Sequence, residues 1–255
     1  MLDSHVPARM PSPRDQRLRD RYGSFAELLQ HHREGVDFDR MLRPRAASNV
    51  VVLAPHGGRM ENHTDTIAEA VAAEDFSLYC FRSRLGRHAP NLHITSHRFD
   101  DPDCVSMLAT HRWAVAIHGC STAGERAFLG GLDVGLVDDL ARAISAAGIQ
   151  VDTTGHPYPG KHPHNIVNRT SSGMGVQIEL SMPLRRSEAR RRHSAVPRPP
   201  GAEPLSRKAA RLTASSSPST SRRPWSLATP PTCGRSTPST ATSSSSRWTA
   251  WAAWA

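Results

Sequence analysis

The sequence lacks the features that define secreted, membrane-spanning and thiolate-metal proteins. It contains four cysteines in 255 residues, and none of them stands in a Cys-x-x-Cys pair. It has no apolar run of the roughly 20 residues that a membrane span needs, and its polar N-terminus lacks the apolar core of a secretory signal. We therefore expect a cytoplasmic protein without a disulfide framework, a thiolate zinc site or a membrane span. Any bound metal would need histidine and carboxylate ligands.

Acidic residues are scarce in only one part of the chain. The formal net charge of +9 would by itself suggest a nucleic-acid binder. Residues 1–186 carry 21 basic and 21 acidic side chains, however, whereas residues 187–255 carry 11 basic and 2 acidic ones. All of the excess charge thus lies in the C-terminal segment, where the arginines are not interleaved with aromatic residues as in a recognisable binding module. We expect no specific nucleic-acid partner.

The same C-terminal segment lacks the residues that build a core. Ser, Thr and Pro occupy 32 of its 69 positions. Such a composition cannot bury enough apolar surface to offset the entropy of ordering the chain. We predict that residues 187–255 form a disordered basic tail, and two origins fit it: a genuine extension or a frame-shifted reading of the gene. The rest of the chain is predicted to comprise a flexible N-terminus, residues 1–21, and one globular domain, residues 22–186.

Apolar, β-branched runs alternate with helical patterns throughout the predicted domain. The runs are typical of short buried strands, and the alternation predicts a three-layer α/β fold with a mostly parallel or mixed central sheet. In such folds, functional sites form beyond the carboxyl ends of the strands. Strands are expected at 50–54, 76–81, 92–95, 113–117, 127–129, 149–153 and 175–180, and helices at 24–30, 65–73, 134–147 and directly after Asp101.

Four chemically active side chains stand at or near strand ends. His56 directly follows one predicted strand, and the two glycines after it permit a tight turn that would return Glu61 toward the imidazole. His118 directly follows a second strand. Glu179 lies inside a third, where an ionised carboxylate is costly unless it is paired or near a metal ion.

Two imidazoles and one carboxylate form the ligand set of a catalytic zinc site. Such a site leaves a fourth position for water, and a further carboxylate acts as general base and acid. In the alternative interpretation, His56 satisfies a loop and Glu179 forms a buried ion pair with an arginine such as Arg169. The convergence of several strand ends favours the metal site over this alternative.

Six ordered motifs extend these observations to a resemblance. Together they resemble the phage and bacterial poly-γ-glutamate hydrolase family, some of whose members carry the label phage-related replication protein, and the resemblance spans residues 22–184. It implies a fold similar to the zinc carboxypeptidases, cleavage of γ-glutamyl amide bonds, zinc on His56, Glu61 and His118, and Glu179 as the catalytic carboxylate. The motifs are APHGGRME (54–61), LHITSHRFDDP (92–102), AIHGC (116–120), FLGG (128–131), NIVNR (165–169) and GVQIELS (175–181).

The substrate implied by this resemblance is a polyanion with one free carboxylate per residue. Guanidinium groups bind carboxylates through paired hydrogen bonds. Arg169, in a loop with Asn165 and Asn168, is therefore our leading candidate for substrate binding. We expect His93 and His97 to be hydrogen-bonded structural residues that could also line the cleft.

Two alternatives to this function remain open at the level of sequence. One is a zinc deacylase or carboxypeptidase-like enzyme that acts on small N-acyl amino acids. The other is an inactive, truncated relic, because family members end in an amphipathic helix and no such pattern is evident after Arg186. We expect the protein to be a monomer.

Overall fold

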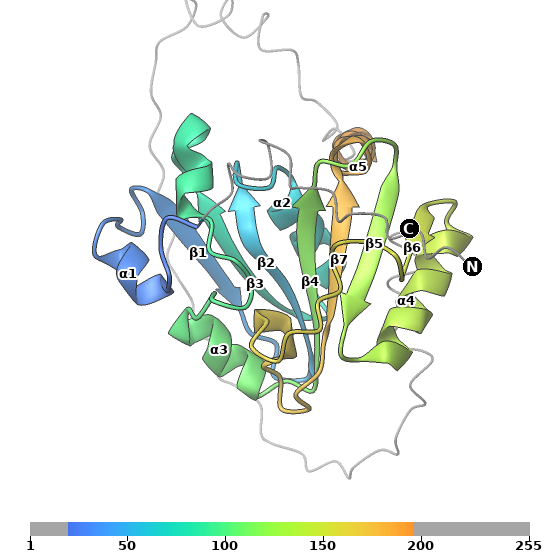
Figure 1. Ribbon diagram of the computed structural model, residues 1–255, viewed down its shortest axis with the longest axis horizontal. Helices are drawn as coiled ribbons and strands as arrows, with labels where there is room; N and C mark the ends of the chain where they lie inside the picture. The colour runs from blue at the N-terminus through green and yellow to red at the C-terminus, as the bar shows by residue number, and fades with distance from the viewer. Residues whose placement is uncertain (1–19, 196–255) are drawn as a thin grey trace, which may run out of the picture.

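A single mixed sheet of seven strands forms the centre of the molecule. The computed structural model describes residues 20–195, so most of the predicted tail and of the predicted flexible N-terminus lies outside the described residues. The strands follow the order β1-β3-β2-β4-β7-β5-β6 (Figure 1). Their bounds are β1 Phe38–Arg43, β2 Val50–Gly58, β3 Ser77–Ser83, β4 Trp113–Cys120, β5 Arg126–Gly131, β6 Gln150–Asp152 and β7 Val176–Ser181.

The central strands are parallel and the outer ones mixed. Strand β2 runs parallel to both β3 and β4, and β4 runs parallel to β7. Strands β1 and β5 are antiparallel to their neighbours β3 and β7, and β6 is parallel to β5. The carboxyl ends of β2, β4 and β7 therefore meet at one edge of the sheet, as the sequence predicted for a parallel centre.

Helices cover both faces of the sheet and complete three layers (Figure 1). Side chains alternate along β2: Val52 packs in the cluster that includes α2 and α4, whereas Val51 packs in the cluster that includes α1 and α3. This arrangement confirms the predicted α/β fold.

Among the helices of the described part of the chain, none has the length and apolar composition that a membrane span requires. The helices are α1 Phe25–Leu29, α2 Thr64–Ala72, α3 Pro102–Ala109, α4 Val134–Ala146 and α5 Met182–Ala195, with 3-10 turns η2 Gly86–Leu92 and η3 Ile166–Asn168.

Residues 92–95 do not form the predicted strand. Leu92 ends η2, and Ile94 lies in a loop, although both side chains are fully buried. The backbone of this loop is bonded by side chains rather than by another strand: His56 Nε2 lies 2.8 Å from the Ile94 carbonyl oxygen, and Thr95 N donates to Asp20. The apolar residues of this segment are thus buried without belonging to a strand. A short apolar run by itself does not distinguish a buried strand from a buried loop.

Two further elements escaped the sequence prediction. Strand β1 has the sequence FDRMLR, and its charged residues hid an edge strand that pairs on one side only. Helix α5 continues past Arg186 to Ala195, so the chain does supply a closing helix. Its pattern was weak because it is rich in arginine, and Leu184 anchors it to the core.

Candidate active site

The turn after β2 brings Glu61 back to His56. The pairing of β2 with β3 is irregular between Ala54 and Gly57, and Gly58 has a positive φ of 68°. The turn closes where Glu61 N donates to the His56 carbonyl oxygen over 2.9 Å. Glu61 Oε1 then lies 3.0 Å from His56 Nδ1. The two glycines permit this course because a Cβ at Gly58 would lie 2.5 Å from the Ser83 carbonyl oxygen.

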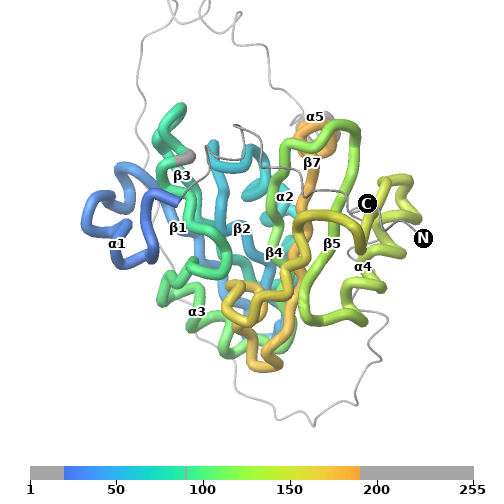
Figure 2. The backbone as a smooth tube through the Cα atoms, in the orientation of Figure 1, coloured from blue at the N-terminus to red at the C-terminus, as the bar shows by residue number. Residues whose placement is uncertain are grey.

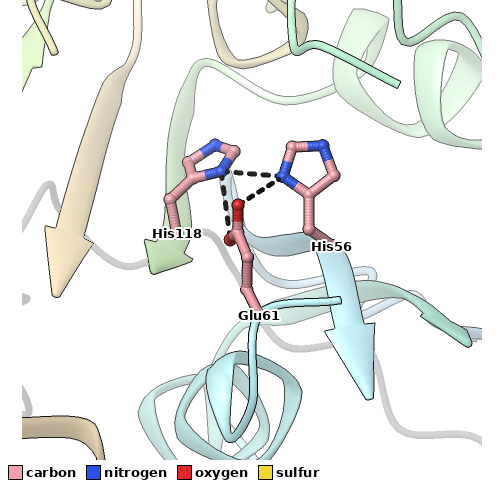
Figure 3. Close-up of side chains that lie close together, drawn as sticks. All are labelled: His56, Glu61 and His118. Carbon is pink, nitrogen blue, oxygen red and sulfur yellow. Dashed lines mark hydrogen bonds and ion pairs between the residues drawn. The ribbon is translucent and has the colours of Figure 1, made fainter. Parts of the chain in front are cut away.

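Strand β4 brings His118 to the same point from the neighbouring strand. His118 lies inside β4, which extends three residues beyond the predicted Ile117 end. Its Nδ1 lies 3.2 Å from His56 Nδ1 and 3.6 Å from Glu61 Oε2 (Figure 3). The next residue, Gly119, donates its backbone N–H to Glu61 Oε2 over 2.8 Å. These three side chains, which the sequence analysis gave as one set of metal ligands, therefore converge at one point.

The convergent atoms fit a divalent metal ion. His56 Nε2 bonds to the carbonyl oxygen of Ile94, an acceptor only, so the proton of this ring is on Nε2 and the lone pair of Nδ1 faces His118. In the same way, His118 Nε2 has a hydrogen-bond partner in Ser96 Oγ, at 3.4 Å, which leaves its Nδ1 facing His56 and Glu61. A tetrahedral zinc ion with bonds of about 2.0–2.1 Å separates its nitrogen ligands by roughly 3.3 Å, close to the observed 3.2 Å. A ligand histidine that bonds a carbonyl through its other nitrogen is the usual arrangement at metal sites.

Burial and the neighbouring charges shift the pKa values of all three proposed ligands. Burial opposes ionisation of Glu61, but the two histidines outweigh it and hold the pKa of Glu61 well below its ordinary range. Burial lowers the pKa of His56 to about 4, which keeps this ring neutral and able to act as a ligand. Burial also acts to lower the pKa of His118, but Glu61 and Glu179 raise it above its usual value.

Glu179 lies beside the three convergent residues on β7. It stands opposite His118 in the pairing of β4 with β7. Burial raises the pKa of Glu179 to about 7; the charge of Glu61 adds to this shift and His118 opposes it. No ion pair joins Glu179 to Arg169 among the described residues, contrary to the alternative considered from the sequence. A carboxyl group with this pKa can both accept and release a proton near neutral pH.

A cavity of about 900 Å³ opens over these residues. His56, Glu61, His118 and Glu179 all line it, which makes it the natural place for a substrate. Residues of the segment between β6 and β7 form one wall, and the backbone of this segment passes across β5 and β7 (Figure 2). Gly131 N donates to the Pro159 carbonyl oxygen and so ties this segment to β5. The wall also includes Tyr158, whose pKa burial raises to about 12, so that its hydroxyl keeps a proton to donate.

The predicted substrate-binding groups are mostly elsewhere. Asn165 lines the cavity, but its amide nitrogen donates to Gln177 Oε1 over 2.7 Å and its oxygen caps η3. Asn168 is not among the lining residues, and its amide nitrogen donates to the carbonyl oxygens of Gly160 and His162. Arg169 does not line the cavity either. Of the three predicted substrate-binding residues, the structure therefore places only Asn165 at this cavity.

Other cationic groups line the cavity in their place. They are Arg59, Lys161 and Arg185. Two of these residues have a feature that could have identified them from the sequence. Arg59 lies inside the APHGGRME motif, next to the proposed ligands, and Lys161 is one of only two lysines in the chain. Arg185 has no such feature, because it is one of several arginines in the same segment. Only the course of α5 places it at the cavity.

His93 also lies at the cavity, held by an acidic partner distant in sequence. Its Nδ1 lies 2.8 Å from Asp20 Oδ1, and its ring centroid lies 4.0 Å from that of His56. Burial opposes ionisation of Asp20, but bonds from His93 and from Thr95 N outweigh it and lower the pKa of Asp20 to about 2. The expected structural role of His93 agrees with this bond, although Asp20 was not foreseen as its partner.

Comparisons with known proteins point to one group. The sequence profile of the poly-gamma-glutamate hydrolase family matches residues 22–195. Protein YndL of Bacillus subtilis (strain 168) is 32% identical over 170 residues, which cover 66% of each chain. The prophage-derived YoqZ of the same organism is 29% identical over 69% of this chain and 64% of its own. The chain thus spans about two thirds of the length of these curated relatives.

Two solved structures share the fold. A bacteriophage poly-gamma-glutamate hydrolase superposes with a TM-score of 0.64 at 31% identity, covering 66% of this chain and 82% of the other. A YndL structure described as apo and zinc-free superposes with a TM-score of 0.60 at 30% identity, covering 66% of this chain and 83% of the other.

Proposed function

Because the chain belongs to the poly-gamma-glutamate hydrolase family, we propose that it is a zinc-dependent amidase that hydrolyses γ-glutamyl amide bonds of poly-γ-glutamate or related acidic peptides. The single observation that carries this proposal is the convergence of His56 Nδ1, His118 Nδ1 and the Glu61 carboxylate in a buried pocket beside a further carboxylate. The zinc-free description of the YndL structure is consistent with a zinc site in the relatives.

The proposed roles follow from the surroundings of each side chain. When held by His56, His118 and Glu61, zinc would supply a Lewis acid for the scissile carbonyl and for a water molecule. Glu179, with a pKa of about 7, takes a proton from the attacking water and returns it to the leaving amine. Tyr158 also lines the cavity, and burial raises its pKa to about 12, so its hydroxyl stays protonated and can act as a hydrogen-bond donor there.

The cations at the cavity support an acidic substrate. Arg59 and Lys161 line the pocket and can attract the free carboxylates of a γ-linked glutamate chain. Arg59 is exposed, and its guanidinium can therefore meet substrate from the solvent side. In this proposal, these two groups take the place given to Arg169 and Asn168 from the sequence.

The experiment that tests the proposal joins metal analysis to a substrate panel. The purified chain is expected to hold about one zinc per molecule and to release amine ends from poly-γ-glutamate, with loss of activity on chelation and recovery on adding zinc. Preferential cleavage of short N-acyl amino acids would support the deacylase alternative. A chain that binds no zinc and releases no amine from any member of the panel would refute the proposal.

A further inference from the structure

Arg185 is a buried arginine near the start of α5 whose guanidinium binds three backbone carbonyl groups. Its Nε donates to the Leu180 oxygen over 3.0 Å, Nη1 to the Asn62 oxygen over 2.5 Å and Nη2 to the Cys120 oxygen over 3.1 Å. The residue is 2% exposed. All three nitrogens of the guanidinium are thus used inside the protein and not in solvent.

The three carbonyl groups belong to the three segments that carry Glu61, His118 and Glu179. The segments are the turn between β2 and α2, the end of β4 and the end of β7. Each contacted carbonyl lies one or two residues after a site residue in the chain: Asn62 after Glu61, Cys120 after His118 and Leu180 after Glu179. One planar, rigid group therefore joins the backbones of all three segments, and it ties the turn that carries Glu61 to the paired strands β4 and β7.

Position 119 is adapted to this contact. A Cβ at Gly119 would lie 2.4 Å from Arg185 Cζ, so the guanidinium fits only because this residue has no side chain. The N–H of Gly119 also donates to Glu61 Oε2. Gly119 thus joins the guanidinium to a proposed metal ligand.

Replacing the guanidinium with an apolar side chain would leave the three carbonyl groups without this donor. A buried acceptor without a partner is unfavourable, so the three segments would shift to find other donors or water. Displacements of about 1 Å at a catalytic centre are enough to reduce turnover by about 100-fold.

We propose that Arg185 is a positioning residue for the hydrolytic reaction. By binding the backbone after Glu61, His118 and Glu179, it holds these side chains at the separations that metal binding and proton transfer require. This inference rests on the proposed function and deepens it. Arg185 acts through the backbone and needs no contact with substrate.

The test compares Arg185→Met and Arg185→Lys with Arg186→Met as the matched control. Arg186 is the next residue on the same helix, but it is exposed. Zinc Kd is measured by competition with a chromogenic chelator, and kcat and KM are measured on poly-γ-glutamate at saturating zinc. Arg185→Met is expected to raise the zinc Kd about 10- to 100-fold and to lower kcat about 100-fold, with KM nearly unchanged. Arg185→Lys should recover part of both losses, and Arg186→Met should match the wild type.

Each other outcome has a defined meaning. Wild-type Kd and kcat in Arg185→Met would overturn the proposal, as would a rise in KM at constant kcat, which would make Arg185 a substrate-binding group. If circular dichroism shows that Arg185→Met is unfolded, Gly119→Ala decides: the same losses in a folded protein support the proposal, and wild-type values overturn it. If Gly119→Ala is also unfolded, Arg185→Lys decides: values of Kd and kcat between those expected for Arg185→Met and those of the wild type support the proposal, and wild-type values overturn it. A wild-type chain without zinc binding or activity would refute the proposed function itself, whereas an active wild type with unchanged variants refutes only this inference.

Discussion

The Nδ1 atoms of His56 and His118 face each other at 3.2 Å, although 62 residues separate them in the chain. His56 carries its proton on Nε2, where it bonds the Ile94 carbonyl oxygen. A lone pair so close to a second ring nitrogen, with the Glu61 carboxylate alongside, is an arrangement that a bound cation stabilises. Four predictions follow from this site and from the elements that hold it.

Removing one imidazole should abolish metal binding. We expect His118→Ala to lose stoichiometric zinc and to lose more than about 100-fold in kcat/KM, because two protein ligands remain where zinc enzymes use three. Metal content by mass spectrometry of the purified protein measures the first effect. His88→Ala is the matched control, since His88 is exposed and lies away from the cavity. Full zinc content in His118→Ala would contradict the assignment.

Glu179→Gln should separate metal binding from turnover. We expect this variant to retain zinc while kcat falls by about 100- to 10,000-fold, because the amide can neither take nor return a proton. In the wild type, kcat/KM should rise with pH through about 7, where Glu179 becomes ionised and able to act as a base. This rise should be absent in Glu179→Gln and present in Glu125→Gln, an exposed control. A wild-type pH profile in the Glu179 variant would exclude it as the base.

Asp20 should contribute pH-dependent stability. Its pKa is about 2 in the folded protein against an ordinary 3.8, so its ionised form favours folding. This stabilisation is present in full above pH 3.8 and is lost as the pH falls toward 2. We expect Asp20→Asn to lower the free energy of unfolding by up to about 2 kcal/mol at pH 7 and by much less at pH 2.5. Urea denaturation at both pH values measures the difference, with exposed Asp138→Asn as the control. An equal loss at both pH values would rule out the charge of Asp20 as the cause.

The turn that returns Glu61 should depend on Gly58. We expect Gly58→Ala to destabilise the protein by at least about 1–2 kcal/mol, since φ is 68° there and the new Cβ would meet the Ser83 backbone. The zinc Kd should rise as well, because Glu61 moves with the turn. Gly135→Ala is the matched control: Gly135 lies in α4, a Cβ there would meet only Asp133 Oδ1 at 3.8 Å, and the substitution should be neutral or stabilising. Thermal unfolding and chelator competition measure the two effects, and an unchanged Kd in Gly58→Ala would contradict the link to Glu61.

Local sequence patterns were sufficient to predict the central strands and to predict that the proposed ligands lie close together. Apolar β-branched runs end just before His56 and His118, and the neighbouring parallel strands β2 and β4 bring their carboxyl ends together. The glycines after His56 permit a tight turn over residues 56–61, which is too short to leave Glu61 far from His56. These features are local, so a pattern of a few residues contains them.

The sequence failed where an element depends on distant partners. The apolar residues of 92–95 suggested a strand, but their backbone bonds go to side chains such as that of Asp20, 75 residues away. Helix α5 looked like part of the basic tail because most of its residues are polar. Arg169 was chosen as a cation beside polar neighbours, although the folded loop does not bring it to the cavity.

The sequence by itself determined the fold class, the position of the central strands and the turn after His56, because these depend on short-range periodicity and on glycine geometry. Only the tertiary structure decided which charged groups meet at the cavity. Arg185 contacts carbonyl groups 5, 65 and 123 residues away in the chain, and Asp20 reaches His93 across 73. Such contacts follow from how layers pack, and no short stretch of sequence specifies them.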